Sequence, residues 1–188
     1  MAHTLTRSLR LTLLLLAGAS MALVPAPGHG RETITAAPRL LADREYYPVL
    51  LQEIERAKGS IDLGMYLWKL TDSPRSKPRQ LLLALGRANR RGVKVRVVLE
   101  ESGHDRDLNR TNRATAQLLE KEGIKVCFDS PKVTSHLKLA VIDNRLVFLG
   151  SHNLTQAALG HNHELSLLIE DGSLAASLTA YLDKLANR

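Results

Sequence analysis

The stretch that decides both the fold and the chemistry of this chain covers positions 136–153 and reads HLKLAVIDNRLVFLGSHN. It contains two apolar runs, at 137–142 and 146–149, each of a length typical of a buried strand. The Asp-Asn pair at 143–144 between them favours a tight turn. We therefore predict a β-hairpin.

The polar residues of this stretch collect at one end of the predicted hairpin. His136 and Lys138 are two apart at the start of the first strand, so their side chains should project to the same side of the sheet. The second strand returns Gly150, Ser151 and Asn153 to that end, where glycine permits close backbone approach. One imidazole surrounded by ammonium, hydroxyl and amide donors suits a tetrahedral phosphoryl oxyanion.

Outside the hairpin, helical and strand-like patterns alternate along the chain. Strands are expected at 33–37, 61–67, 93–99, 124–128 and 165–169, and helices at 45–57, 80–90, 109–122, 156–159 and 173–185, the last capped by Ser173. This alternation favours an α/β fold, with a mixed central sheet flanked by helices on both faces in a single domain. No internal repeat is visible.

The first thirty residues differ in composition from the rest. Two arginines precede an apolar run at 11–19, and small residues and prolines follow at 25–28. This order predicts a signal peptide at 1–30, a mature domain at 31–188 and a periplasmic or secreted location. The apolar run is short for a membrane span of about 20 residues, so an uncleaved anchor is the less favoured alternative.

The basic residues of the chain are concentrated in one region. The net charge is +7, and positions 69–113 hold twelve Lys or Arg against five Asp or Glu. Such a region suggests a footprint for a polyanion, the alternative being a solvated basic face. Lys77, Arg110 and Arg113 fall near loops expected at the carboxyl ends of strands, which border the crevice of an open α/β sheet. We therefore expect these three residues to bind substrate phosphates.

Neither a disulfide nor a metal ion is expected to hold this chain together. Cys127 is the only cysteine, and its apolar surroundings favour a buried small side chain. His152, His161, His163 and Glu164 are close in sequence, but their spacing matches no strong metal signature. We therefore expect no metal and no other cofactor.

The combined pattern His-x-Lys-x4-Asp, six residues, then Gly-Ser-x-Asn resembles that of the phospholipase D superfamily. Six fixed residue types at fixed spacing would arise by chance on the order of once in 10⁸ windows. The chain resembles in particular the short bacterial members with a single motif, which are nucleases of the Nuc type. The resemblance covers the chain from about Thr33 to the C-terminus, and its specific motifs lie between His136 and Glu164.

The resemblance implies a double-displacement mechanism. His136 would attack phosphorus and form a phosphohistidine, while a second histidine would protonate the leaving oxygen and later activate water. Lys138 and Asn153 would bind the non-bridging oxygens, with Ser151 as a supporting donor. His152 fills the variable position of Gly-Ser-x-Asn and is expected to line the pocket or contact the substrate.

Two carboxylates and the subunit arrangement also follow from the resemblance. Glu164 falls where relatives carry a Glu that orients the nucleophilic imidazole, much as in a hydrolytic triad. Asp143 is the family's aspartate, which more often has a structural or supporting role than a contact with the phosphate, and it is carried over into the catalytic group in that sense. Because one motif supplies one histidine and the reaction needs two, the resemblance implies a two-fold homodimer with its active site at the interface.

Three functions remain open from the sequence. The leading expectation is a metal-independent endonuclease that cleaves DNA, and RNA as well, outside the cytoplasm. A phospholipase D that removes headgroups from membrane lipids would use the same residues. A nucleic-acid-binding module without chemistry would not need His136. The basic region and the lack of an obvious apolar loop for lipid favour the nuclease.

Overall fold

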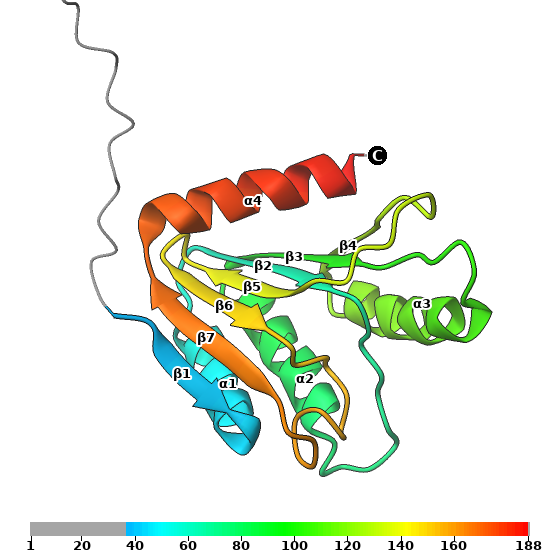
Figure 1. Ribbon diagram of the computed structural model, residues 1–188, viewed down its shortest axis with the longest axis horizontal. Helices are drawn as coiled ribbons and strands as arrows, with labels where there is room; N and C mark the ends of the chain where they lie inside the picture. The colour runs from blue at the N-terminus through cyan, green and yellow to red at the C-terminus, as the bar shows by residue number, and fades with distance from the viewer. Residues whose placement is uncertain (1–36, 188) are drawn as a thin grey trace, which may run out of the picture. The chain divides into compact units, whose positions relative to one another are not determined.

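The computed structural model describes residues 37–187, which form a seven-stranded sheet in the order β1-β7-β6-β5-β2-β3-β4 (Figure 1). The strands are β1 (Arg39–Ala42), β2 (Ser60–Met65), β3 (Lys94–Leu99), β4 (Lys125–Phe128), β5 (Lys138–Ile142), β6 (Leu146–Gly150) and β7 (Leu165–Glu170). The helices are the short 3-10 turn η1 (Asp43–Glu45), α1 (Tyr46–Arg56), α2 (Lys77–Arg90), α3 (Arg106–Lys121) and α4 (Gly172–Ala186). Strands β2, β3 and β4 run parallel, and the remaining pairs are antiparallel. The predicted single domain with a mixed sheet is confirmed.

Helices cover both faces of the sheet, as predicted (Figure 1). Helices α1, α2 and α3 pack on one face, where Ala140 and Ile142 of β5 point into the larger core. Helix α4 packs on the other face, where Leu139 and Val141 of β5 point into a second core. Successive β5 residues therefore feed opposite cores, as the pleat of a strand requires. Each fully buried aliphatic side chain contributes roughly 1.5–3 kcal/mol relative to an exposed one.

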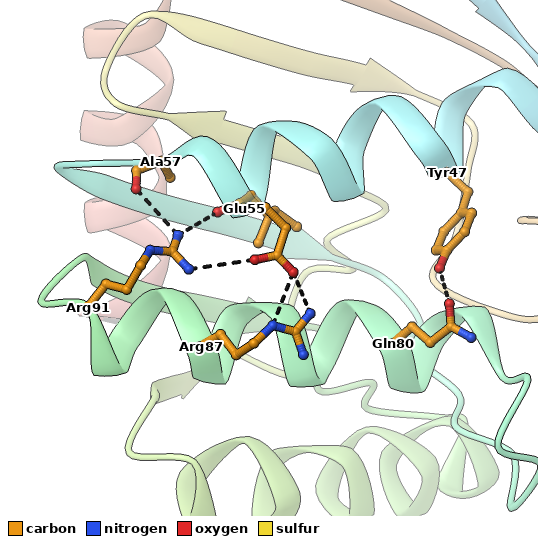
Figure 2. Close-up of polar contacts among 7 residues, drawn as sticks. Tyr47, Glu55, Ala57, Gln80, Arg87 and Arg91 are labelled. Carbon is orange, nitrogen blue, oxygen red and sulfur yellow. Dashed lines mark hydrogen bonds and ion pairs between the residues drawn. The ribbon is translucent and has the colours of Figure 1, made fainter.

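Polar contacts join α1 to α2 beside the larger core (Figure 2). Glu55 accepts a hydrogen bond of 3.1 Å from Nε of Arg87 and lies 3.6 Å from Nη1 of Arg91. Arg91 also donates to the carbonyls of Ile54 and Ala57 at the end of α1, at 3.1 and 3.4 Å. These carbonyls have no partner within their own helix, so the arginine both caps α1 and fixes its register against α2.

Two elements differ from the sequence prediction. Most of the strand expected at 33–37 lies outside the described residues, and the edge strand β1 is found at Arg39–Ala42. Residues 156–159, predicted as a short helix, form successive turns. The amides of Gly160, His161 and Asn162 all donate to the Ala157 carbonyl, so the segment closes after about one turn instead of continuing as a helix.

Helix α4 uses a different cap from the one predicted. The carboxylate of Asp171 accepts hydrogen bonds from the amides of Ser173 and Leu174, at 2.9 and 3.0 Å. A negative side chain suits the positive end of the helix dipole better than a neutral hydroxyl does. Ser173, predicted as the cap, therefore lies inside the first turn.

The N-terminal prediction is not addressed by this fold. The signal peptide expected at 1–30 lies outside the described residues, so it stays a prediction. Within residues 37–187, none of the helices is long and apolar enough to cross a membrane.

Candidate active site

The hairpin of β5 and β6 brings the two halves of the motif to one end of the sheet. Strand β5 begins at Lys138, which is paired with Met65 at the end of β2. Strand β6 returns antiparallel to β5 and ends at Gly150, which is paired with Ser166. The hairpin predicted from the sequence is confirmed, and it places the start of β5 and the end of β6 side by side.

His136 and Lys138 both lie against the ring of Tyr66. The solvent-exposed imidazole of His136 meets the Tyr66 ring edge to face, with 4.4 Å between centroids. The Lys138 ammonium lies 4.8 Å from the Tyr66 centroid and donates a 3.0 Å hydrogen bond to the carbonyl of His136. Lys138 is only 4% exposed, so a cation is held at the rim of the core by a ring face and a carbonyl. Tyr66 thus fixes the imidazole and the ammonium relative to each other.

The surroundings of His136 favour its neutral form. Partial desolvation lowers the pKa of His136, and the positive charge of Lys138 lowers it further. Burial also lowers the pKa of Lys138, an effect that the negative charge of Glu164 opposes. A neutral imidazole has the free lone pair that a nucleophile needs.

The loop after β6 carries the remaining motif residues. A side chain at Gly150 would collide with Oγ of Ser166 and with the Leu165 carbonyl, so only glycine permits this close approach to β7. Asn153 is half-buried, and among the described residues its Oδ1 has no hydrogen-bond partner. An unpaired buried amide oxygen costs about 1–3 kcal/mol and can be satisfied only by a donor, so a phosphate oxygen would have to bind the amide nitrogen of Asn153 instead.

Ser151 and Glu164 are joined to each other. The Ser151 hydroxyl donates to Oε2 of Glu164 and accepts a 3.1 Å hydrogen bond from the Leu165 amide. The other Glu164 oxygen accepts from the Asn162 amide group at 3.0 Å. Within residues 37–187, neither Glu164 oxygen is hydrogen-bonded to His136. The expected role of Glu164 in orienting that imidazole therefore stays a prediction.

His152 has a structural role. Its side chain is completely buried and stacks on Tyr46, with 4.2 Å between centroids. Its Nδ1 lies 2.8 Å from Oγ of Ser166 and its Nε2 lies 2.9 Å from the carbonyl of Asp43. The expectation that His152 lines the pocket or contacts the substrate is wrong, because residues distant in sequence enclose its ring.

Asp143 also lies away from the site. It occupies the β5–β6 turn, five residues and roughly 16 Å along the strand from Lys138. Its carboxylate accepts from the amides of Lys58, Gly59 and Ser60, at 3.1, 2.7 and 3.1 Å. Burial alone would raise the pKa of Asp143, but these amides and Arg145 lower it overall. Asp143 ties the hairpin turn to the start of β2, and its place in the catalytic group stays a prediction.

The three basic residues expected at the substrate have partners of their own. Nζ of Lys77 donates a 2.6 Å hydrogen bond to the Leu159 carbonyl and lies 5.3 Å from the Tyr47 ring centroid, so it holds α2 to the loop after β6. Arg110 pairs with the exposed Asp107 at 2.8 Å. Arg113 pairs with Glu101 at 2.7 Å and lies 5.4 Å from the Phe128 ring.

The three basic side chains differ in how free they are to bind a substrate phosphate. The ion pair of Arg110 with Asp107 is exposed and weak enough for a phosphate to replace, whereas the Glu101 partner of Arg113 is mostly buried. Lys77 is engaged in fold contacts. In the described structure none of the three is hydrogen-bonded to His136, Lys138 or Asn153, so their contact with substrate stays a prediction.

Sequence reasoning missed Tyr66, Glu100 and Asp43. Tyr66 and Glu100 directly follow β2 and β3, at the carboxyl ends of neighbouring parallel strands. That position is a known signal for site residues in open α/β sheets and could have identified both. Glu100 accepts a 2.6 Å hydrogen bond from the amide of Ser135, next to His136. No sequence signal marks Asp43, which contacts Glu164 and His152 through the fold alone.

A metal site in the described part of the chain would need several metal-ligating side chains to gather at one place. Among residues 37–187, no group of three or more His, Cys, Asp or Glu side chains is arranged to hold a metal ion. Cys127 is unpaired and half-buried in β4.

The fold and this constellation define the class of the protein, and comparison with known proteins identifies its family. Residues 50–186 match the family described as "Cardiolipin synthase, PLD-like domain". The chain therefore belongs to the phospholipase D superfamily, a class of phosphodiesterases. It is similar to Nuc from Salmonella typhimurium, a solved phospholipase D family member, with 27% identity and a TM-score of 0.67 over 80% of this chain and 94% of that one.

Two curated relatives bear names that refer to lipids. Human mitochondrial cardiolipin hydrolase is 35% identical over 65% of this chain and 43% of its own length. Phospholipase D of Rickettsia prowazekii is 34% identical over 68% of this chain and 56% of its own length. The chain thus spans about half the length of these relatives. NucT from Helicobacter pylori, at 24% identity and a TM-score of 0.62, shares the fold.

Proposed function

We propose that this chain is an exported, metal-independent phosphodiesterase, and that it acts as a non-specific endonuclease on DNA and RNA through a phosphohistidine on His136. The observation that carries the proposal is the exposed imidazole of His136, fixed beside the buried ammonium of Lys138 by Tyr66. Similarity to Nuc, which extends over 94% of that chain, supports the nuclease more directly than similarity to parts of longer lipid enzymes.

The first step forms a bond between nitrogen and phosphorus. The neutral imidazole of His136 attacks the diester, the bond from phosphorus to the leaving oxygen breaks, and a second histidine donates its proton to that oxygen. In the second step the same histidine, now neutral, takes a proton from water. The resulting hydroxide attacks phosphorus, the nitrogen–phosphorus bond breaks and His136 is released.

The neighbouring residues stabilise charge during both steps. The Lys138 ammonium and the Asn153 amide bind non-bridging oxygens, and fixed donors of this kind lower the barrier because they need no reorganisation. Ser151 donates its hydroxyl proton to Glu164, so its part is to hold that carboxylate in place. Glu164 also favours the charged form of Lys138 through its negative charge, which keeps the phosphate site cationic.

The second histidine comes from another copy of the chain in this proposal. Each protomer would contribute His136, Lys138 and Asn153 to a shared site. A surface for such pairing is provided by four exposed leucines that lie on one face of neighbouring strands: Leu40, Leu149, Leu165 and Leu167. Leu149 directly precedes Gly150, and Leu165 directly follows Glu164. Exposed apolar patches commonly mark protein interfaces, and this one borders the site.

Membrane phospholipid is the second candidate substrate. Two observations favour it: the lipid-related names of the relatives, and the strongly exposed Val133 in the loop that leads to His136. Exposed apolar residues beside a catalytic group can enter a lipid surface. The same histidine chemistry would then release the headgroup.

The decisive experiment compares substrates in the absence of metal. Purified protein beginning at residue 31 is incubated in EDTA with plasmid DNA, and separately with vesicles of phosphatidylcholine or cardiolipin. We expect DNA cleavage by the wild type and none by His136→Ala. Cleavage confined to vesicles would establish the lipid alternative, and a requirement for added magnesium or zinc would refute the metal-independent mechanism.

A second experiment tests the shared site. Sedimentation or light scattering should show a dimer, and Leu167→Lys should shift it toward monomer with loss of activity. Mixing His136→Ala with Lys138→Ala protomers should give kinetics that differ from the sum of the two separate proteins. A fully active monomer would contradict the dimeric site.

A further inference from the structure

Asp43 adopts a backbone conformation that is unusual for its residue type. It opens the η1 turn between β1 and α1, far from the motif in sequence, with a φ of 51°. This left-handed region costs residues other than glycine on the order of 1–2 kcal/mol, and Asp and Asn are among the few that adopt it. The surrounding contacts must therefore hold Asp43 in place.

Asp43 and Glu164 bind each other through two reciprocal hydrogen bonds. The Asp43 amide donates to the Glu164 carbonyl at 2.8 Å. In return Oδ1 of Asp43 accepts from the Glu164 amide at 2.8 Å. This pair of bonds fixes the backbone from which the Glu164 side chain reaches Ser151.

The Asp43 carbonyl reaches the other half of the motif through His152. It lies 2.9 Å from Nε2 of His152, and because a carbonyl can only accept, Nε2 carries the proton. Nδ1 of His152 then accepts from the Ser166 hydroxyl at 2.8 Å. This neutral tautomer agrees with the lowered pKa of His152, caused mainly by burial. Asp43 therefore anchors the Gly-Ser-x-Asn loop at its buried histidine.

The remaining Asp43 oxygen lies at the surface, against an exposed histidine. Oδ2 lies 3.2 Å from Nδ1 of the exposed His163. Asp43, His163, Ser151 and Glu164 border the same hollow of about 530 Å³. Asp43 thus contacts both the buried His152 and the backbone of Glu164, and it borders the hollow that Ser151 and Glu164 line.

We propose that Asp43 is a positioning residue for the active site, which fixes Glu164 and its partner Ser151 in the geometry that receives the substrate phosphate. The inference rests on the proposed function, because it assumes that Glu164, held by Ser151, keeps the phosphate site cationic. Loss of the Asp43 carboxylate leaves the Glu164 amide without its acceptor and allows the Glu164–Ser151 pair to move. Misplacement by about 1 Å can reduce a rate about 100-fold.

Three substitutions separate positioning from folding. Asp43→Asn keeps an oxygen for the Glu164 amide and tolerates the positive φ, so its kcat should stay within about threefold of wild type. Asp43→Ala should lower kcat about 10- to 100-fold with little change in KM. Asp43→Gly relieves the backbone strain and should be more stable than Asp43→Ala, but equally slow. The probe is bis(4-nitrophenyl) phosphate in EDTA, with thermal unfolding measured in parallel.

Asp171→Ala is the matched control. The Asp171 carboxylate accepts from two backbone amides where that of Asp43 accepts from one, but Asp171 lies at the other end of β7 and caps α4. Its loss should lower the melting temperature and leave kcat within about twofold of wild type.

The possible outcomes distinguish the inference from the function on which it rests. Wild-type kcat in Asp43→Gly, or an equal loss of kcat in Asp171→Ala, would overturn the positioning role while the diesterase activity stands. If His136→Ala hydrolyses the probe as fast as wild type, the proposed function fails and the inference fails with it. If Asp43→Ala does not fold, the comparison of the Asn and Gly variants decides.

Discussion

The backbone amide of Ser135 donates a 2.6 Å hydrogen bond to the buried carboxylate of Glu100. Ser135 directly precedes His136, so this bond fixes the end of the loop that delivers the imidazole. Glu100 is only 1% exposed, and among the described residues its Oε1 has no partner. Burial raises the pKa of Glu100, the Ser135 amide opposes this effect, and the charges of Asp129 and Glu101 add to it.

Because its pKa is raised, Glu100 should make the folded protein less stable as the pH rises. The folded state binds this proton more tightly than the unfolded chain, so the stabilisation is complete below 4.5, the ordinary pKa of the group. It is lost between 4.5 and the raised value in the folded protein. Glu100→Gln keeps an acceptor for Ser135 without this titration and should flatten the decline.

Melting temperatures from about pH 4 to about pH 8 measure this effect. Glu101→Gln, which changes the neighbouring carboxylate, serves as the comparison and should retain most of the wild-type slope. Identical pH dependence in wild type and Glu100→Gln would show that Glu100 is not the group responsible.

The charge of Lys138 should set the protonation of His136. Desolvation is the larger cause of the lowered His136 pKa, and the positive charge of Lys138 is the second. Lys138→Met removes that second cause. We therefore expect the His136 pKa to rise in this variant, as measured by NMR titration of the ring protons. Lys132→Met removes a charge from an exposed position of the same loop and should change that pKa by less than about 0.2. Equal effects of both variants would contradict a specific influence of Lys138.

The ring of Tyr66, rather than its hydroxyl, should be what the site requires. Tyr66→Phe keeps both the edge contact with His136 and the face presented to Lys138, so kcat on a small diester should change less than about threefold. Tyr66→Leu removes the ring and should lower kcat at least about tenfold, since the two groups lose their common support. Comparable rates for the Phe and Leu variants would show that the ring has no such role.

The hairpin was predictable because its determinants are local. Two apolar runs, a turn pair and a spacing of two between His136 and Lys138 suffice to place an imidazole and an ammonium at one strand start. The fold class followed equally from the alternation of periodic segments. Helix ends were less predictable. Asp171 and Ser173 are both suitable caps for α4, and the sequence pattern does not show which of them is used.

The roles of individual polar residues were less predictable because they depend on distant contacts. His152 stands beside motif residues, yet Tyr46 and Ser166 enclose it from other elements. Asp143 belongs to the motif, yet its carboxylate binds the amides before β2. Spacing along the chain carries no information on either environment.

Asp143 should therefore matter for stability and not for catalysis. Asp143→Ala leaves three backbone amides without their acceptor and should cost about 1–3 kcal/mol, with kcat unchanged at a temperature where the variant is folded. Because its folded pKa is lowered, its contribution is present above 3.8 and is lost as the pH falls through the folded value. Denaturant unfolding at neutral and acidic pH measures both effects. A large fall in kcat in a stable, folded variant would return Asp143 to the catalytic group.

Gly150 should tolerate no side chain, because β7 lies directly against its Cα. In Gly150→Ala the methyl group would collide with the Leu165 carbonyl, which is backbone and held in the sheet, and with Oγ of Ser166. Relief requires the loop carrying Ser151 and Asn153 to move, so we expect both a loss of stability of about 1–3 kcal/mol and a fall in kcat of at least about tenfold.

Gly172→Ala provides the matched control for this substitution. At Gly172, in the first turn of α4, an added methyl would meet only the Asn144 carbonyl at an ordinary 3.7 Å. Alanine also favours a helix over glycine by up to about 1 kcal/mol, so this variant should be at least as stable as wild type with unchanged kcat. Thermal unfolding and diester hydrolysis of the two alanine variants therefore test whether close approach of the loop to β7 is what places Ser151 and Asn153. A Gly150→Ala protein with the stability and rate of Gly172→Ala would show that the loop is placed by other contacts.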